Sequence, residues 1–301
     1  MKTASLPART GVAIVVLCLA SAGFVRDRAI AVRDQGTPGG EILYLQSSTA
    51  LRRLSLGYSS LLADIYWTRA VQYFGGKHLR SSKEYLLLYP LLDIATDLDP
   101  HLIPAYDAGS MLLSSSPPAG AGEPDKAAAL VEKGIKANPE RWRLYFTLGF
   151  IHYIDRHDYK AAQQAFEKGS QIPGALPWMN VMAASMAERA GEPSTAFELW
   201  SRLAESTQDK YIQENARKHL AALQSDQEVT VLEQRVAAYK NATGKVPSSW
   251  QELIRAGLLR GIPADPAGHP YRLTAKGTVE ITNLSEMPFV TRGIPGHSSN
   301  P

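Results

Sequence analysis

Residues 142–170 read WRLYFTLGFIHYIDRHDYKAAQQAFEKGS, and Pro173 follows them closely. In the first half of this stretch, apolar side chains recur every three or four residues, as they do along an amphipathic helix. Asp158 then offers a carboxylate to the free amide groups at the start of a second helix. The small residues Ala162 and Gly169 allow that helix to approach its neighbour closely. The stretch therefore predicts two packed helices joined by a short turn.

The same arrangement recurs along the chain with a period of about 34 residues, a length typical of helical repeats. The phrase G-E-P-x-x-A begins at Gly122 and again at Gly191, 69 residues later (191 − 122). Gly134 and Gly169 stand in similar phrases and are 35 residues apart (169 − 134). Because the markers share one period, we expect stacked units that each bury an apolar face against the next unit.

These units resemble the tetratricopeptide repeat, a helical hairpin with small and large residues at fixed positions. Tyr145 and Gly149 match the first helix of that pattern, and Ala162 and Phe166 match the second helix one residue late, which implies a turn longer by one residue. The resemblance covers about residues 59–223. It implies a mainly α protein, a helical-hairpin array (an α-solenoid) whose concave face holds a protein or peptide partner.

In such arrays the first helix of each hairpin lines the concave face. Transferred to this chain, that pattern gives a partner-binding groove lined by Tyr106, Phe146, Phe150, Tyr153 and Trp178. Aromatic rings suit this role because they bury a large area at a small cost in side-chain entropy. The alternative is that the rings pack between neighbouring helices as core. Phe150 and Tyr153 are the best groove candidates.

A small α+β module is expected after the repeats. Ser249 and Glu252 form a capping box for a short helix, and residues 261–270, GIPADPAGHP, contain three prolines and two glycines, which exclude a helix. The phrases YRLT and VEIT then predict a β-hairpin with Gly277 in its turn.

This C-terminal region resembles the globular part of the type II secretion major pseudopilin. Asp265, Pro266, Gly268, Pro270 and Tyr271 match its D-P-x-G-x-P-Y phrase. In this chain an alanine follows the first proline where that family usually has tryptophan, and the family's calcium loop is not apparent. The resemblance implies a pseudopilin-like module on a chain that is not itself a pilin.

Residues 11–25 read GVAIVVLCLASAGFV and carry no charge. The run is short for a membrane span, which needs roughly 17 to 25 residues, and Ala20-Ser21-Ala22 supplies a cleavage motif. Either an uncleaved inner-membrane anchor leaves the body facing the periplasm, or cleavage leaves a periplasmic protein. The predicted divisions are a signal or anchor segment (1–28), an extended lead-in (29–58), tetratricopeptide-like repeats (59–223), the pseudopilin-like module (224–283) and a flexible tail (284–301).

Composition excludes several classes of function. A formal charge of +3 over 301 residues gives no basic footprint for nucleic acid. The one cysteine, Cys18, excludes a disulfide framework and a multi-cysteine zinc site. The seven histidines fall in no metal-ligand spacing, and no nucleophile elbow or phosphate loop occurs. We therefore expect no catalytic residues, no metal and no cofactor.

The sequence thus predicts a non-enzymatic, protein-binding scaffold of the cell envelope that holds a partner in an assembly, with secretion or pilus assembly suggested by the C-terminal resemblance. The membrane is a further partner if the N-terminal segment is uncleaved. Two alternatives stay open. One is a soluble periplasmic peptide-binding chaperone, and the other is an envelope enzyme that uses the C-terminal module.

Overall fold

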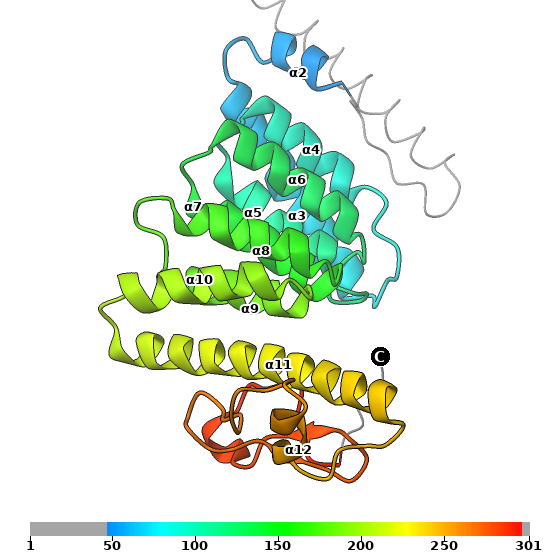
Figure 1. Ribbon diagram of the computed structural model, residues 1–301. Helices are drawn as coiled ribbons and strands as arrows, with labels where there is room; N and C mark the ends of the chain where they lie inside the picture. The colour runs from blue at the N-terminus through cyan, green and yellow to red at the C-terminus, as the bar shows by residue number, and fades with distance from the viewer. Residues whose placement is uncertain (1–46, 297–301) are drawn as a thin grey trace, which may run out of the picture. The chain divides into compact units, whose positions relative to one another are not determined.

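The computed structural model describes residues 47–296. Residues from Ser48 onward belong to one compact unit, which is mainly α: helices pack in sequential pairs and a small two-stranded sheet follows them (Figure 1). The apolar run 11–25 and residues 29–46 of the predicted lead-in lie outside the described residues. Among the helices of residues 47–296, none is both long and apolar enough to cross a membrane.

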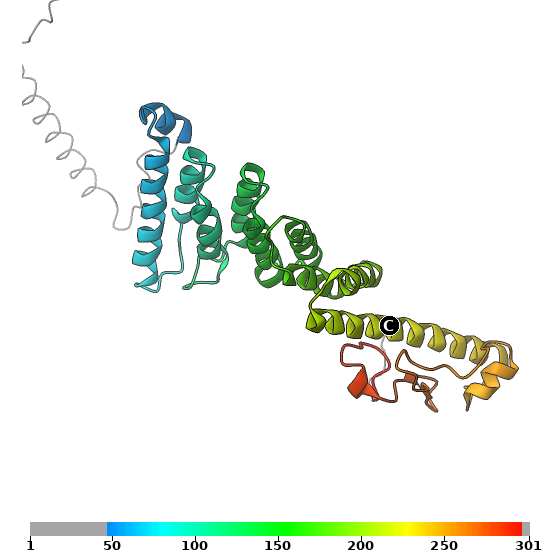
Figure 2. The same ribbon diagram turned by 90° about the vertical axis from the view of Figure 1, so that its left-hand side faces the viewer.

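Each helix of the first part packs mainly on its neighbours in sequence, a succession that Figure 2 shows from α3 to α10. The elements are α2 (Ser48–Leu54), α3 (Ser59–His78), α4 (Leu88–Leu98), α5 (Ile103–Ser114), α6 (Pro124–Ala137), α7 (Trp142–Phe150), the π-helix η1 (Ile151–Asp155), α8 (Tyr159–Ser170), α9 (Trp178–Arg189) and α10 (Pro193–Ser206).

The described end of the expected extended lead-in is a helix, so that prediction is wrong for α2. Its sequence, STALRRL, is rich in residues that favour helix. Leu51 is buried against the first helices, and the hydroxyl of Ser55 donates to the carbonyl of Arg52 at 2.7 Å. The buried side chain of Leu51 and the hydrogen bond of Ser55 at the C-terminal end thus stabilise the helix α2.

Glycines set the close approach of successive helices. A Cβ atom on Gly134 of α6 would lie 2.7 Å from the ring of Tyr106 in α5, and one on Gly149 of α7 would lie 2.7 Å from the ring of Phe166 in α8. Both rings are wholly buried. The missing side chain makes room for the ring, so the close packing predicted for Gly149 is confirmed.

The turn between α7 and α8 begins with a π-helix. The amide of Arg156 donates to the carbonyl of Ile151, five residues earlier, at 3.1 Å. A π-helical turn holds more residues than an α-helical one, which accounts for the additional residue that the sequence implied here. Asp158 then caps α8 by accepting a hydrogen bond from the amide of Ala161 at 2.9 Å, as predicted.

One helix, α11 (Lys210–Thr243), joins the two parts of the described chain (Figure 1). The boundary predicted between residues 223 and 224 falls inside it. Its N-terminal half packs on α10, and Val229, Leu232 and Val236 from its C-terminal half enter a separate apolar core. The helix ends at Gly244, whose φ of 74° is the left-handed conformation that favours glycine.

The C-terminal module lies against α11. It contains α12 (Trp250–Arg255), strands β1 (Arg272–Leu273) and β2 (Val279–Glu280) and the 3₁₀-helix η2 (Leu284–Glu286). The two strands pair antiparallel, and the turn between them contains Gly277 at a φ of 86°, so the predicted hairpin is confirmed. The predicted capping box is wrong: Ser249 is the N-cap of α12 but makes no side-chain cap hydrogen bond. Glu252 instead accepts from the hydroxyl and the amide of Ser248, at 2.5 and 3.1 Å.

The tail expected to be flexible is instead held against α11 as far as Gly293. Asp226 accepts hydrogen bonds from the amides of Thr291 and Arg292 at 3.0 and 2.8 Å. Met287 is buried, and the ring of Phe289 stacks on His219 with 3.8 Å between ring centroids. We call residues 287–293 the C-terminal strap. Its anchors are polar and apolar contacts to a helix more than sixty residues earlier in sequence.

Candidate functional site

Four of the five predicted groove residues lie together in the structure. The ring centroids of Phe146 and Phe150 are 4.9 Å apart, and the ring of Trp178 is 5.3 Å from the first and 6.2 Å from the second. Tyr153 continues the row at 6.4 Å from Phe150. We call these four residues the aromatic strip. They come from α7, η1 and α9, and each is half-buried.

The rings of the aromatic strip both pack on the core and reach the surface, so each of the two predicted alternatives describes part of their environment. Phe150 packs edge to face on the wholly buried ring of Phe166, at 5.3 Å between centroids and an interplanar angle of 85°. All four strip rings pack against the apolar core of this region or against each other. Each half-buried ring thus has one side on the core and another side at the surface.

The structure adds three residues that the groove prediction missed. Trp142 meets Phe146 edge to face at 6.2 Å, and Tyr159 lies 6.2 Å from Tyr153 at the other end of the row. The guanidinium of Arg189 lies 5.3 Å from the ring centroid of Tyr153, within range of a cation–π contact. The spacing Trp142–Phe146–Phe150, one residue every helical turn, is a sequence signal for the first of these. Tyr159 and Arg189 come from other helices, and local periodicity does not reveal them.

Tyr106 does not belong to this surface, which corrects its prediction as a groove residue. Its side chain is 0 % exposed, and its ring fills the space that Gly134 leaves open. Burial raises the pKa of its hydroxyl above the ordinary value, because the charged form is poorly solvated there. Tyr106 is a core residue between α5 and α6.

The π-helix η1 forms the end of the strip. Tyr153 lies within it, seven residues after Phe146 and three after Phe150, a spacing that keeps side chains on one helix face. The neighbouring His152 is buried, and its Nδ1 atom lies 3.2 Å from a guanidinium nitrogen of Arg156. Burial, together with that positive charge, lowers the pKa of His152. Short π-helical turns occur frequently at functional sites, and this one carries an aromatic residue of the candidate surface.

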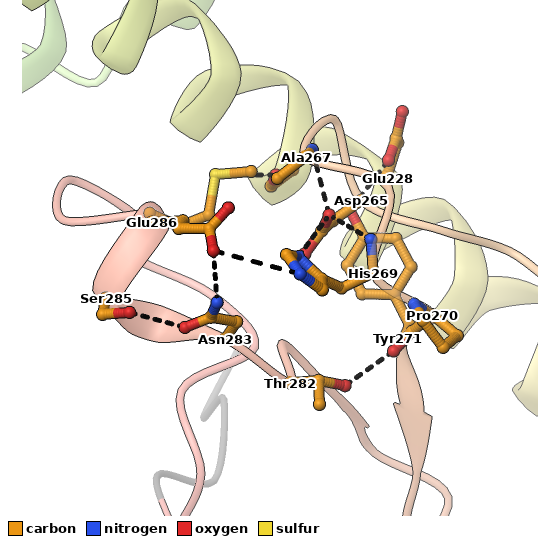
Figure 3. A network of polar contacts seen from close by, with 12 residues as sticks. Glu228, Asp265, Ala267, His269, Pro270, Tyr271, Thr282, Asn283, Ser285 and Glu286 are labelled. Carbon is orange, nitrogen blue, oxygen red and sulfur yellow. Dashed lines mark hydrogen bonds and ion pairs between the residues drawn. The ribbon is translucent and has the colours of Figure 1, made fainter.

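A second polar network lies in the C-terminal module, at the D-P-x-G-x-P-Y phrase (Figure 3). One carboxylate oxygen of Asp265 accepts from the amides of Ala267 and His269, at 3.0 and 2.9 Å. Gly268 in the same turn has a φ of 91°. The Nδ1 atom of His269 lies 3.7 Å from Asp265, and its Nε2 atom lies 3.9 Å from Glu286. Asp265 thus shapes the turn, and His269 lies between two carboxylates.

The same phrase attaches the module to α11. The hydroxyl of Tyr271 donates to Glu228 at 2.7 Å, and burial and this carboxylate raise the pKa of that hydroxyl. The hydroxyl of Thr282 donates to the carbonyl of Pro270 at 2.6 Å. These contacts hold the loop in place. Over residues 47–296, no cluster of three or more histidine, cysteine, aspartate or glutamate side chains is arranged to hold a metal ion.

Two shallow clefts flank this loop along α11. The first has a volume of about 520 Å³ and includes Glu228, Val231 and Tyr271 in its lining. The second has a volume of about 460 Å³ and includes Arg217, Lys218 and Glu286. Tyr271 already uses its hydroxyl on Glu228, and neither cleft brings together a nucleophile and a base. The aromatic strip is the stronger candidate for a binding surface.

Comparison of the chain with models of known protein families and with curated proteins finds no match.

Proposed function

We propose that this chain is a tetratricopeptide-like helical-repeat protein of the cell envelope that binds a protein or peptide on the aromatic strip and catalyses no reaction. The observation that carries the proposal is the strip itself: half-buried rings of Phe146, Phe150, Tyr153 and Trp178 in mutual contact. Rings at the surface, held by a core, are the usual anchors of protein interfaces.

The repeat assignment is supported by equivalent contacts in successive helix pairs. Gly134 of α6 makes room for the ring of Tyr106 in α5, and one repeat later Gly169 of α8 lies equally close to the side chain of Tyr145 in α7. Contacts of this kind let the two helices of a hairpin approach closely, and their recurrence at a fixed period is expected of the stacked units of an α-solenoid. We propose that α3 to α10 form such an array.

The chemistry of the strip indicates the kind of segment it binds. Its rings offer apolar faces, and the guanidinium of Arg189 at one end offers a positive charge beside Tyr153. Arginine and aromatic residues are both enriched at the centres of interfaces. The partner we expect therefore presents an apolar or aromatic side chain next to a carboxylate. The resemblance of the C-terminal module to a pseudopilin suggests a partner in a secretion or pilus-related assembly.

A photo-crosslinking amino acid placed at residue 153 tests this proposal in cells. We expect a crosslink to one discrete envelope protein. The control position is Tyr211 on α11, which is 81 % exposed and far from the strip in sequence. A crosslink that is equally strong at both positions, or absent at 153, would contradict the proposal. A ladder of many products at 153 alone would instead indicate the alternative function, a peptide-binding chaperone.

A further inference from the structure

The turn between α2 and α3 exposes a group of apolar side chains. Leu56 is 86 % exposed within this turn, and Leu54, Tyr58, Leu61 and Ile65 are also exposed. We call these five residues the apolar tip. Leu61 and Ile65 lie one helical turn apart, so they share a face of α3.

The backbone at Leu56 is unfavourable for a leucine. Its φ is 50°, in the left-handed region, and Gly57 follows at 94°. Residues other than glycine, asparagine and aspartate rarely adopt this region, because the Cβ atom crowds the backbone. Leu56 gains little from packing in return, since its side chain is exposed. An apolar side chain held outward at a cost in backbone energy points to an interaction outside the fold.

The charged residues around the apolar tip, and the polar residues that follow it on the same face of α3, indicate what kind of surface contacts it. Arg52 and Arg53 stand in the last turn of α2, and both are exposed. The exposed acid in the first turns of α3 is Asp64. The positions that continue the Leu61–Ile65 face are Thr68 and Gln72, which are polar. An apolar patch confined to a turn and two helical turns, with basic residues at its edge, fits the interfacial region of an anionic bilayer.

The chain outside the structure allows this contact. The apolar run, which an uncleaved anchor would place in the membrane, ends at Val25, and residues 26–46 connect it to the described chain. Those 21 residues span up to roughly 70 Å when extended, at about 3.3–3.6 Å per residue. The tip lies in the first two described helices after that run, so it is the described part closest in sequence to the bilayer.

We propose that the apolar tip lies on an anionic lipid surface, with Leu56 and Tyr58 at the boundary between headgroups and acyl chains and with Arg53 at the phosphate level. This inference rests on the cell-envelope location in the proposed function, in the form in which the N-terminal segment stays uncleaved as a membrane anchor. It does not depend on the partner that binds the aromatic strip.

The test uses the full chain with Cys18→Ser and one new cysteine, Leu56→Cys, that carries a polarity-sensitive dye. The control is Leu79→Cys, which is equally exposed at 86 % and lies beyond the other end of α3. A helix of 20 residues is about 30 Å long. Both proteins are reconstituted in vesicles of phosphatidylcholine with or without phosphatidylglycerol, and the vesicles carry a lipid-bound quencher.

We expect several-fold stronger quenching at residue 56 than at residue 79, and we expect the difference to grow with phosphatidylglycerol and to shrink in Arg53→Gln. Equal, weak quenching at both positions in protein that floats with the vesicles would overturn the tip contact while membrane attachment stands. Failure to float would remove the membrane attachment itself and the tip contact with it. A blue shift of the residue-56 dye without vesicles would assign the tip to a protein contact and also overturn the inference.

Discussion

At the residue scale, single small or titratable side chains decide how the helices fit together. Gly149 has no room for a Cβ atom, whereas Gly76, inside α3, has nothing within 4 Å of the corresponding position. The sequence could predict the first of these because the repeat pattern requires a small residue there. It could not predict which glycines are unrestricted, since that depends on the neighbouring helix.

The two glycines provide a matched pair of variants. We expect Gly149→Ala to lower the free energy of unfolding by about 1–3 kcal/mol, because the new methyl group overpacks the site of Phe166. Gly76→Ala should raise it by roughly 0.5–1 kcal/mol, because alanine favours helix. Chemical denaturation measures both values. Equal stability of the two variants would contradict the close approach of α7 and α8.

His152 gives stability a dependence on pH. Its pKa is lowered in the folded chain by burial and by Arg156, so the unfolded chain binds the proton first as the pH falls. The contribution of neutral His152 to the free energy of unfolding is therefore fully present above the pKa of histidine in the unfolded chain, about 6.5. This contribution decreases as the pH falls below that value.

We expect the midpoint of denaturation to fall between pH 7 and pH 5 in the wild-type chain, and to fall less in His152→Gln. Thermal unfolding at several pH values checks this expectation. His157→Gln is the control, since His157 is exposed in the next turn. A variant at residue 152 whose pH profile matches that of the control would show that His152 is not buried as described.

At the scale of elements, α11 and the C-terminal strap show where local patterns lose their predictive power. Ser225 and Asp226 lie near the boundary predicted from sequence, yet the helix passes through them. Ser225 is wholly buried, with its hydroxyl 3.9 Å from the sulfur of Met287, and Asp226 bonds to the strap. The strap lies more than sixty residues away in sequence, and no local signal reveals such partners.

Asp226 is expected to be the main polar anchor of the strap. Its carboxylate also accepts from the hydroxyl of Thr291 at 2.6 Å. Asp226→Ala removes every one of these acceptors, so we expect the amides of Thr291 and Arg292 to exchange hydrogen faster, while the repeats stay folded. Hydrogen exchange with mass spectrometry measures this change. Asn241→Ala, at an exposed position near the C-terminal end of the same helix, should leave exchange at the strap unaltered, and a similar increase in that control would contradict the assignment.

The π-helix η1 belongs to the same scale. The sequence predicted a turn longer by one residue between Gly149 and Phe166, but it did not predict that a π-helix would take up that residue. The structure has a π-helical turn at this place, and that turn carries Tyr153. Local sequence patterns were therefore sufficient to predict the helices α7 and α8, the N-cap Asp158 and the close contact at Gly149. The row of rings needed residues from α7, η1, α8 and α9 to be brought together.

At the scale of the whole molecule, α11 runs from an apolar core among α7 to α10 to a separate apolar core in the C-terminal module, and the candidate surface lies on the former. The sequence could predict which part was helical and which contained the hairpin, because period and turn residues are local. It placed Tyr106 at the groove although that ring is buried. The position of a residue within a helix predicts the helix face on which its side chain lies. Whether that face is exposed or buried depends on the neighbouring helix.

The central claim is that the aromatic strip binds a partner, and the most direct test is one paired measurement on Tyr153→Ala. The affinity for the partner identified by crosslinking and the thermal midpoint are measured on the same protein, with Tyr211→Ala as the control. We expect the variant to lose about 2 kcal/mol or more of binding free energy, roughly 30-fold in Kd, while its midpoint stays within a few degrees of wild type. Unchanged affinity at unchanged stability would show that the partner binds elsewhere, and a large drop in the midpoint would return Tyr153 to the core; either result contradicts the account.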